Sequence, residues 1–249
     1  MTKIEIKPIT DATGCTAVEQ LQLDAWQMDD NLEVVPGHML LTFHKNGGVL
    51  LGAYAGERLV GFVAGFVGLM GNGRIKHASH MMGIHPEFQG QGMGTRLKLA
   101  QRQAVQQQGL DLITWTYDPL ETANARLNIH KLGAVCSTYI PNLYGEIEGI
   151  NAGLPSDRFQ VDWHINSAHV EERLAGGDEE ETAVPEHLIL NPVVGNGQPA
   201  DTTKSPNEAR HFVQIPANIR ALKNQDMPLA LAWRQHTRQP HRLTDICEK

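Results

Sequence analysis

The sequence predicts an α+β protein with a mixed, mostly antiparallel central sheet, flanking helices and a small C-terminal extension. Successive apolar runs of strand length lie between residues 49 and 84 with no helix between them, which is typical of antiparallel strands. Helix-like apolar periods precede and follow these runs. The 249 residues, 41% of them hydrophobic, can bury one sizeable core with an appendage.

The individual elements follow from apolar periodicity and from residues that begin or end helices. Asp11 is the expected N-cap of the first helix, and Gly109 and Gly133 each end a later helix. Gly56-Glu57-Arg58 separates two apolar runs and predicts a hairpin. The expected order is a strand over 4–9, helices over 12–28 and 38–45, strands over 49–55, 59–69 and 75–84, a loop over 86–94, a helix over 95–108, a strand over 111–117, a helix over 122–132, and strands over 135–139 and 158–165.

Charge and cysteine usage exclude several classes of protein. Twenty-one Lys and Arg against 28 Asp and Glu give a net charge of -7, the wrong sign for binding nucleic acid through the overall field. Cys15, Cys136 and Cys247 lie far apart, which argues against a disulfide framework or a structural metal. The N-terminus lacks the apolar core of a signal peptide, and the run 59–70 is too short to span a membrane. We therefore expect a cytoplasmic protein with no metal, nucleic-acid or membrane partner.

Composition changes after about residue 175. Residues 171–209 hold nine acidic residues against two basic ones, with several Gly and Pro, and predict a solvated connector. The acidic run 178–181 could also attract a cationic substrate, although the connector interpretation is favoured. Residues 210–249 reverse the charge balance, with a strand-like segment over 212–215 and a helix-like segment over 229–238. The expected domains are 1–170, a connector over 171–209 and a small α/β extension over 210–249.

The most informative segment runs from Ile84 to Thr95. Glycines at 90, 92 and 94 allow the backbone to turn several N–H groups toward one point, at the start of a helix whose dipole favours an anion. This pattern indicates a phosphate cradle. Three basic residues follow and are expected to supply local positive charge; they are Arg96, Lys98 and Arg102.

Three other interpretations compete for this segment. A glycine-rich turn before a helix is often only a turn. A Walker loop is excluded because no Gly-Lys-Ser/Thr ends the motif. A Rossmann fingerprint is disfavoured because the spacing is Gly-x-Gly-x-Gly and the strands before it are expected to be antiparallel.

The pattern Gln89-x-x-Gly92-x-Gly94 after Ile84-x-Pro86 resembles the acyl-CoA pyrophosphate loop of the GNAT superfamily of N-acyltransferases, and the expected element order over residues 1–166 is similar to that fold. The resemblance implies transfer of an acyl group, with acetyl from acetyl-CoA expected, to an amine by direct attack. Four segments resemble a branch of uncharacterised bacterial and archaeal acetyltransferases; they are Trp115–Leu120, Asn124–Asn128, Lys131–Ala134 and Asn142–Gly145.

The resemblance also implies roles for particular residues. Backbone groups of Met82 and Ile84 would pair with the pantetheine amides, and a backbone N–H of the same strand would polarise the oxyanion. Asn124 stands near the position where the family carries a helix Asn, which itself maps onto Thr122. Loop amides would hold the pyrophosphate; the residues are Gln89, Gly90, Gln91, Gly92, Met93, Gly94 and Thr95.

The catalytic residues are less well defined. The family often places a Tyr acid where this chain has Ile129, so Tyr144 is a candidate substitute, or else an ordinary loop residue. His80, or His77, lies on the strand where relatives often carry a Glu base, and a strand histidine can equally be structural. Asp118 is a further candidate, or it only caps the turn after its strand.

Two functions from different classes therefore remain open. The first is an N-acyltransferase whose acceptor is a small-molecule or peptide amine. The second is a non-catalytic acyl-CoA-binding sensor or scaffold, which the missing Tyr keeps open. The sequence leaves the acceptor unidentified, and it leaves a homodimer open.

Overall fold

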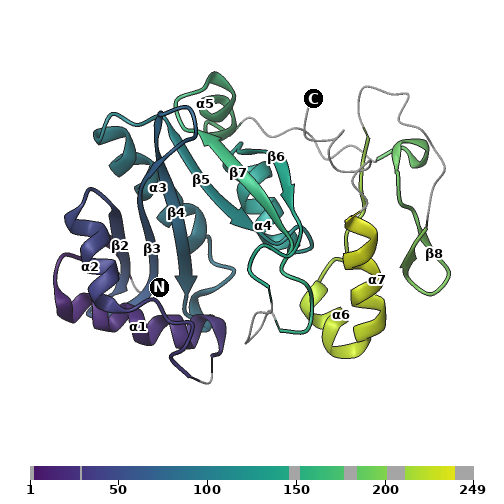
Figure 1. The fold of residues 1–249 in the computed structure, drawn as a ribbon, viewed down its shortest axis with the longest axis horizontal. Helices are drawn as coiled ribbons and strands as arrows, with labels where there is room; N and C mark the ends of the chain where they lie inside the picture. Colours follow the sequence, from purple (N-terminus) through teal and green to yellow (C-terminus); the bar gives the residue numbers. More distant parts are fainter. Residues whose placement is uncertain (1–2, 29, 146–151, 177–183, 201–210, 239–249) are drawn as a thin grey trace. The chain divides into compact units, whose positions relative to one another are not determined.

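The computed structural model describes residues 3–28, 30–145, 152–176, 184–200 and 211–238. Seven strands form one sheet in the order β1-β2-β3-β4-β5-β7-β6 (Figure 1). The pairs from β1 to β4 are antiparallel and β4 pairs with β5 in parallel, so the predicted α+β class is confirmed. The strands are β1 (Ile4–Pro8), β2 (Val49–Ala55), β3 (Arg58–Leu69), β4 (Ile75–Ile84), β5 (Leu112–Tyr117), β6 (Val135–Ile140) and β7 (Arg158–His164), with a small hairpin of β8 (Val193–Val194) and β9 (Gln198–Pro199).

The helices agree with the sequence in the first half of the chain and depart from it later. The helix expected over 122–132 is α-helical only at its start and then becomes a π-helix, while α5, α6 and the β8–β9 hairpin were not predicted. Of the strand expected over 212–215, only an isolated bridge from Phe212 to Ile189 is found. The helices are α1 (Ala12–Trp26), α2 (Gly37–Lys45), α3 (Met93–Gln107), α4 (Thr122–Ala125), the π-helix η2 (Arg126–Lys131), α5 (Ala168–Leu174), α6 (Ile219–Gln225) and α7 (Met227–Thr237), with 3-10 turns η1 (Pro86–Phe88) and η4 (Glu186–Leu188).

Contacts divide the chain into two compact units. Unit 1 comprises Met1–Trp115 and Asp162–Glu171, and unit 2 comprises Thr116–Val161 and Glu172–Lys249. The domain limits expected from composition, at 170 and 209, stay a prediction. The acidic run 178–181 lies outside the described residues.

In unit 1, helices cover both faces of strands β2 to β4 (Figure 1). Helices α1 and α2 close one face over Phe62 and Ala64, and α1 begins at the expected cap, where Asp11 Oδ1 accepts a hydrogen bond from Gly14 N at 2.8 Å. Helix α3 lies on the other face, where Leu97 is fully buried close to Gly61. The two faces follow from the alternation of side chains along β3.

In unit 2, the described part of the C-terminal segment builds a hydrophobic core with residues that follow β5. Leu120 packs with Ile219 of α6 and with Ala230 and Trp233 of α7, and partly buried Leu154 joins them. Across the described residues of both units, no helix is long and apolar enough to cross a membrane.

Candidate active site

Strand β4 carries a β-bulge at His80. The pairing with β3 passes from Met81–Ala64 to Ser79–Gly65, so His80 is the extra residue and has no partner in this ladder. Its ring lies beside Phe43 of α2 and Phe66 of β3, with ring centroids 6.3 and 6.1 Å away. Desolvation beside these rings lowers the pKa of the exposed His80 below its usual 6.5. A neutral imidazole at pH 7 can accept a proton.

The two edges of β4 differ in how far they are paired. On one side, β3 pairs with β4 from Ile75 to Ile84. On the other side, the parallel ladder recorded with β5 comprises His77–Ile113 and Ala78–Thr114, whereas β4 itself continues through Met82 to Ile84. Backbone N–H and C=O groups along a strand edge can pair with the amides of an extended ligand. The structure thus places Met82 and Ile84 on a strand that extends beyond its ladder with β5.

The glycine-rich loop leads directly into α3. Gly92 is the N-cap with φ of 76°, and Gly90 has φ of 73°, a region that favours glycine. A Cβ atom added at either position would meet no atom within 4 Å, so the space in front of the loop is open. The first N–H groups of α3, from Met93 to Thr95, have no partner within the helix because of their position in its first turn. This arrangement suits an anion such as a phosphate.

Side chains of the loop hold it in place. Gln89 Nε2 donates to the carbonyl oxygen of Ile84 at 3.0 Å, and Gln91 Nε2 donates to that of Glu87 at 2.9 Å. Glu87 in turn forms an ion pair with Arg58 at 2.9 Å. The glutamine side chains therefore stabilise the loop. Gln89 N itself donates to the carbonyl oxygen of Pro86 at 3.2 Å, so the backbone amides from Gly90 to Thr95 are the groups left to meet a ligand.

Lys98 does not supply charge to this loop, and the expectation that it would is wrong. Its side chain is buried against the sheet, where Nζ donates to Ser79 Oγ at 2.9 Å and to Gln101 Oε1 at 3.1 Å and lies 3.6 Å from the ring centroid of Trp115. Burial lowers the pKa of Lys98 to about 7. The buried His77 joins the same network through a 3.1 Å contact between its Nε2 and Gln101 Nε2, and burial followed by the charge of Lys98 lowers its pKa to about 4. Burial in this network favours a structural role for His77 over a role as general base.

Arg96 and Arg102 are likewise directed at protein groups. Arg96 Nη2 donates to the carbonyl oxygen of Ile4 at 2.8 Å. Arg102 donates from Nε and Nη2 to the carbonyl oxygen of Ile165 and forms an ion pair with Glu171 of α5. The helical period of α3 explains the error, because it turns position 98 toward the sheet and position 102 toward the segment after β7.

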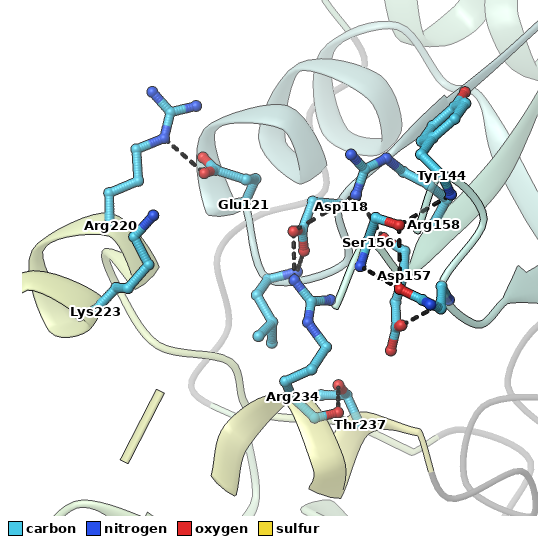
Figure 2. Close-up of polar contacts among 12 residues, drawn as sticks. Asp118, Glu121, Tyr144, Ser156, Asp157, Arg158, Arg220, Lys223, Arg234 and Thr237 are labelled. Atoms are coloured by element: carbon cyan, nitrogen blue, oxygen red, sulfur yellow. Dashed lines mark hydrogen bonds and ion pairs between the residues drawn. The ribbon is translucent and has the colours of Figure 1, made fainter. Parts of the chain in front are cut away.

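In unit 2, Tyr144 lies over a cation. Its ring centroid is 5.3 Å from the Arg158 guanidinium, and its hydroxyl is 3.1 Å from Thr116 Oγ1 at the end of β5. Figure 2 shows the Arg158 guanidinium between the Tyr144 ring and Asp118. The tyrosine is 57% exposed, so a ligand can reach this residue.

Both oxygens of Asp118 are engaged. Oδ1 accepts a hydrogen bond from Leu120 N at 2.9 Å, which caps the turn after β5. Oδ2 forms an ion pair with Arg234 of α7 and lies 3.8 Å from Arg158 Nη1 (Figure 2). The structure thus joins Tyr144 and Asp118 through Arg158. Sequence reasoning missed both arginines, because no local pattern marks them and they lie 40 and 116 residues beyond Asp118.

The helix after β5 carries the residues that the family resemblance singles out, Thr122, Asn124 and Ile129, but its second half is a π-helix. Leu132 N donates to Leu127 O at 3.0 Å, five residues back, which defines the π-helix η2. Thr122 Oγ1 donates to the carbonyl oxygen of Pro216 at 2.9 Å, while Asn124 is half-buried and Ile129 is exposed. π-Helical turns occur often at functional sites. Among the described residues, no group of three His, Cys, Asp or Glu side chains could hold a metal ion.

Comparison with known proteins agrees with this geometry. Residues 15–134 match the model of the Acetyltransferase (GNAT) family. Similar solved structures include yncA from Salmonella typhimurium with its cofactor acetyl-CoA (18% identity, TM-score 0.51, 66% of this chain and 96% of that one) and a GNAT-family acetyltransferase from Streptococcus pneumoniae (16%, 0.52, 64% and 98%). The ribosomal-protein-S18-alanine N-acetyltransferase from Escherichia coli is also similar (13%, 0.52, 73% and 100%). No curated protein shows a significant sequence match.

The fold is therefore that of the GNAT acetyltransferases. Residues 15–134 belong to the GNAT acetyltransferase family, which confirms the resemblance found in the sequence.

Proposed function

We propose that this protein transfers an acetyl group from acetyl-CoA to the amine of an acceptor by direct attack. The observation that carries the proposal is the open glycine-rich loop at the start of α3, within a GNAT-family domain. The similar yncA structure holds acetyl-CoA, and the similar enzyme from E. coli is named for N-acetylation of an alanine. Both names support the proposed cofactor and the proposed amine acceptor.

The cofactor is assigned to the loop and to strand β4. Backbone amides from Gly90 to Thr95 bind the pyrophosphate, since the glutamine side chains and the N–H of Gln89 are used to hold the loop in place. Backbone groups of Met82 and Ile84 pair with the pantetheine amides. Asn124, half-buried on α4, is proposed as a further contact.

The chemistry needs one proton acceptor and one proton donor. His80 accepts the proton of the acceptor ammonium, directly or through one water, because its lowered pKa keeps the imidazole neutral at pH 7. The amine nitrogen then bonds to the thioester carbonyl carbon, the C–S bond breaks, and the thiolate of CoA leaves. The hydroxyl of Tyr144, a residue that is 57% exposed, protonates that thiolate. Asp118, engaged with Arg234 and Leu120, orients the arginines beside Tyr144.

The decisive experiment separates binding from turnover. Calorimetry with CoA is compared for the wild type, Gly92→Asp and Gly109→Asp. Both glycines have φ of 76° and open space around a new Cβ, and they lie at opposite ends of α3. We expect Gly92→Asp to weaken CoA binding about tenfold or more by placing a charge beside phosphate, and Gly109→Asp to leave binding unchanged.

Release of CoA from acetyl-CoA is then measured with a panel of amines. Release that depends on an amine supports the transferase. Tight CoA binding without release for any amine indicates the sensor or scaffold instead. Equal CoA affinity in folded Gly92→Asp and Gly109→Asp refutes the assignment of the loop.

A further inference from the structure

In unit 2, the charges of five neighbouring side chains do not sum to zero. Arg238 binds Asp157 with two hydrogen bonds, at 2.7 Å from Nε and 2.6 Å from Nη2, and Arg234 pairs with Asp118. Among the described residues, the carboxylate that pairs with Arg158 is that of Asp118, which Arg158 shares with Arg234: Asp118 Oδ2 is 3.8 Å from Arg158 Nη1, and this Nη1 donates to the carbonyl oxygen of Asp157 at 2.8 Å. Three cations thus meet two carboxylates, which leaves one excess positive charge. We call these five side chains the arginine cluster.

Two arginines of the arginine cluster are largely removed from solvent, so unmatched positive charge on them is costly, whereas the Arg238 side chain is 33% exposed. The Arg234 side chain is 0% exposed and that of Arg158 is 11% exposed. In the described part of the chain, Arg234 Nε and Nη1 have no hydrogen-bond partner although both are buried. Buried charges are normally paired and buried donors normally bonded, because leaving either unmatched is unfavourable. Burial lowers the pKa of Arg158, opposed by the neighbouring Asp118, which is consistent with a cation in need of a partner.

The side of the arginine cluster that a ligand can reach is marked by Tyr144. This residue lies over the Arg158 guanidinium (Figure 2) and is 57% exposed, whereas the Arg234 side chain is fully buried. The hydroxyls of Tyr144 and Thr116 lie 3.1 Å apart, and both can form hydrogen bonds with a ligand. A second polar pair drawn in Figure 2, Arg220 with Glu121, lies outside the arginine cluster.

The missing charge also indicates the chemistry of the ligand. One negative charge neutralises the arginine cluster, which a carboxylate supplies, while a phosphate dianion would leave an excess negative charge. The planar fork of an arginine matches a carboxylate with two parallel hydrogen bonds.

We propose that Arg158, with Arg234 behind it, binds a carboxylate of the acceptor, so that the acceptor is an amino acid or a peptide-like compound rather than a simple amine. The assignment of the bound carboxylate to an acceptor rests on the function proposed above, whereas the carboxylate-binding site itself does not.

Matched amines test the specificity. Release of CoA is compared for L-phenylalanine with phenethylamine, L-leucine with 3-methylbutylamine, and glycine with methylamine. We expect the acid of at least one pair to have a kcat/KM at least about tenfold above that of its decarboxylated twin. Arg158→Gln abolishes this preference because it lowers kcat/KM for the amino acid more than for its decarboxylated twin. Arg158→Lys keeps part of the preference, and Arg220→Gln, which removes a cation outside the arginine cluster, leaves it unchanged. Equal rates within every pair, or equal losses for acid and amine in Arg158→Gln, overturn the proposal.

A binding measurement keeps the two proposals separable if no amine is acetylated. Thermal unfolding of the full chain is followed with N-acetyl-L-phenylalanine, N-acetylphenethylamine or inorganic phosphate. Stabilisation by the carboxylate alone, lost in Arg158→Gln, upholds the site even where the transferase proposal fails. No stabilisation by the carboxylate, or a larger effect of phosphate, contradicts it.

Discussion

Replacing Lys98 by Met should stabilise the protein at neutral pH and remove a pH dependence that the wild type shows. The Lys98 side chain is buried between the sheet and α3, above the ring of Trp115. Its pKa of about 7, against 10.5 in an unfolded chain, corresponds to about 5 kcal/mol of unfavourable free energy for the folded, protonated state.

The sign of this pH dependence follows from the number of protons that the folded and the unfolded chain bind. Between pH 7 and 10.5 the folded chain has released the proton of Lys98 and the unfolded chain still holds it, so the free energy of unfolding rises with pH. Below pH 7 both states are protonated and the unfavourable term is constant. Met removes the charge and leaves Gln101 bonded, because Ser79 Oγ still donates to Gln101 Oε1 at 3.1 Å.

The assay is urea unfolding at pH 7, 8, 9 and 10 for the wild type, Lys98→Met and Lys45→Met. Lys45 is an exposed lysine at the end of α2 and serves as the matched control. We expect the free-energy advantage of Lys98→Met over the wild type to be largest at pH 7 and to shrink by about 3 kcal/mol up to pH 10, while Lys45→Met follows the wild type. Parallel pH profiles for the wild type and Lys98→Met would show that Lys98 keeps its charge, and would refute the argument.

Three further predictions follow from the same structure. His80→Gln should lower the rate of acetyl transfer about 10²-fold with CoA affinity intact, and should remove a rise in rate centred below pH 6.5; a near-normal pH–rate profile would exclude the base role. Gly65→Ala should destabilise the fold by about 1–3 kcal/mol in urea unfolding, because its Cβ would lie 2.6 Å from the carbonyl oxygen of Ala78 and against the His77 ring, whereas Gly68→Ala, with its nearest atom at 3.6 Å, should change little. Limited proteolysis should cut first between residues 176 and 207, as the acidic composition predicts, and earlier cleavage in the N-terminal region would place the boundary elsewhere.

Elements with strong local signals could be predicted from the sequence. The strands over 49–55 and 75–84 coincide with β2 and β4, and Asp11 caps α1 as expected. The glycine-rich loop was also identified correctly as the entry to α3. Apolar alternation, a capping side chain and clustered glycines each act within a few residues, so a single sequence reveals them.

Features that depend on distant partners could not be predicted in this way. Lys98 was expected to supply positive charge to the loop because of its position after it, but the helical period directs it to Ser79 on β4 and Trp115 on β5. The shift to a π-helix after Ala125 likewise has no signal that separates it from an ordinary helix. In both cases tertiary packing decides between local alternatives of similar free energy.

The side chains that we assign to the acceptor lie outside the matched family region. Residues 15–134 contain the loop, β4 and His80, which are proposed to bind CoA and accept the proton. Tyr144, Arg158 and Arg234 follow residue 134, and Arg234 comes from a helix, α7, that packs on Leu120. CoA binding and acceptor binding are thus assigned to different residues. Substitutions at Arg158 should therefore change which amine is used and leave CoA binding unchanged. We therefore expect acceptor preference to depend on the residues that follow the matched region.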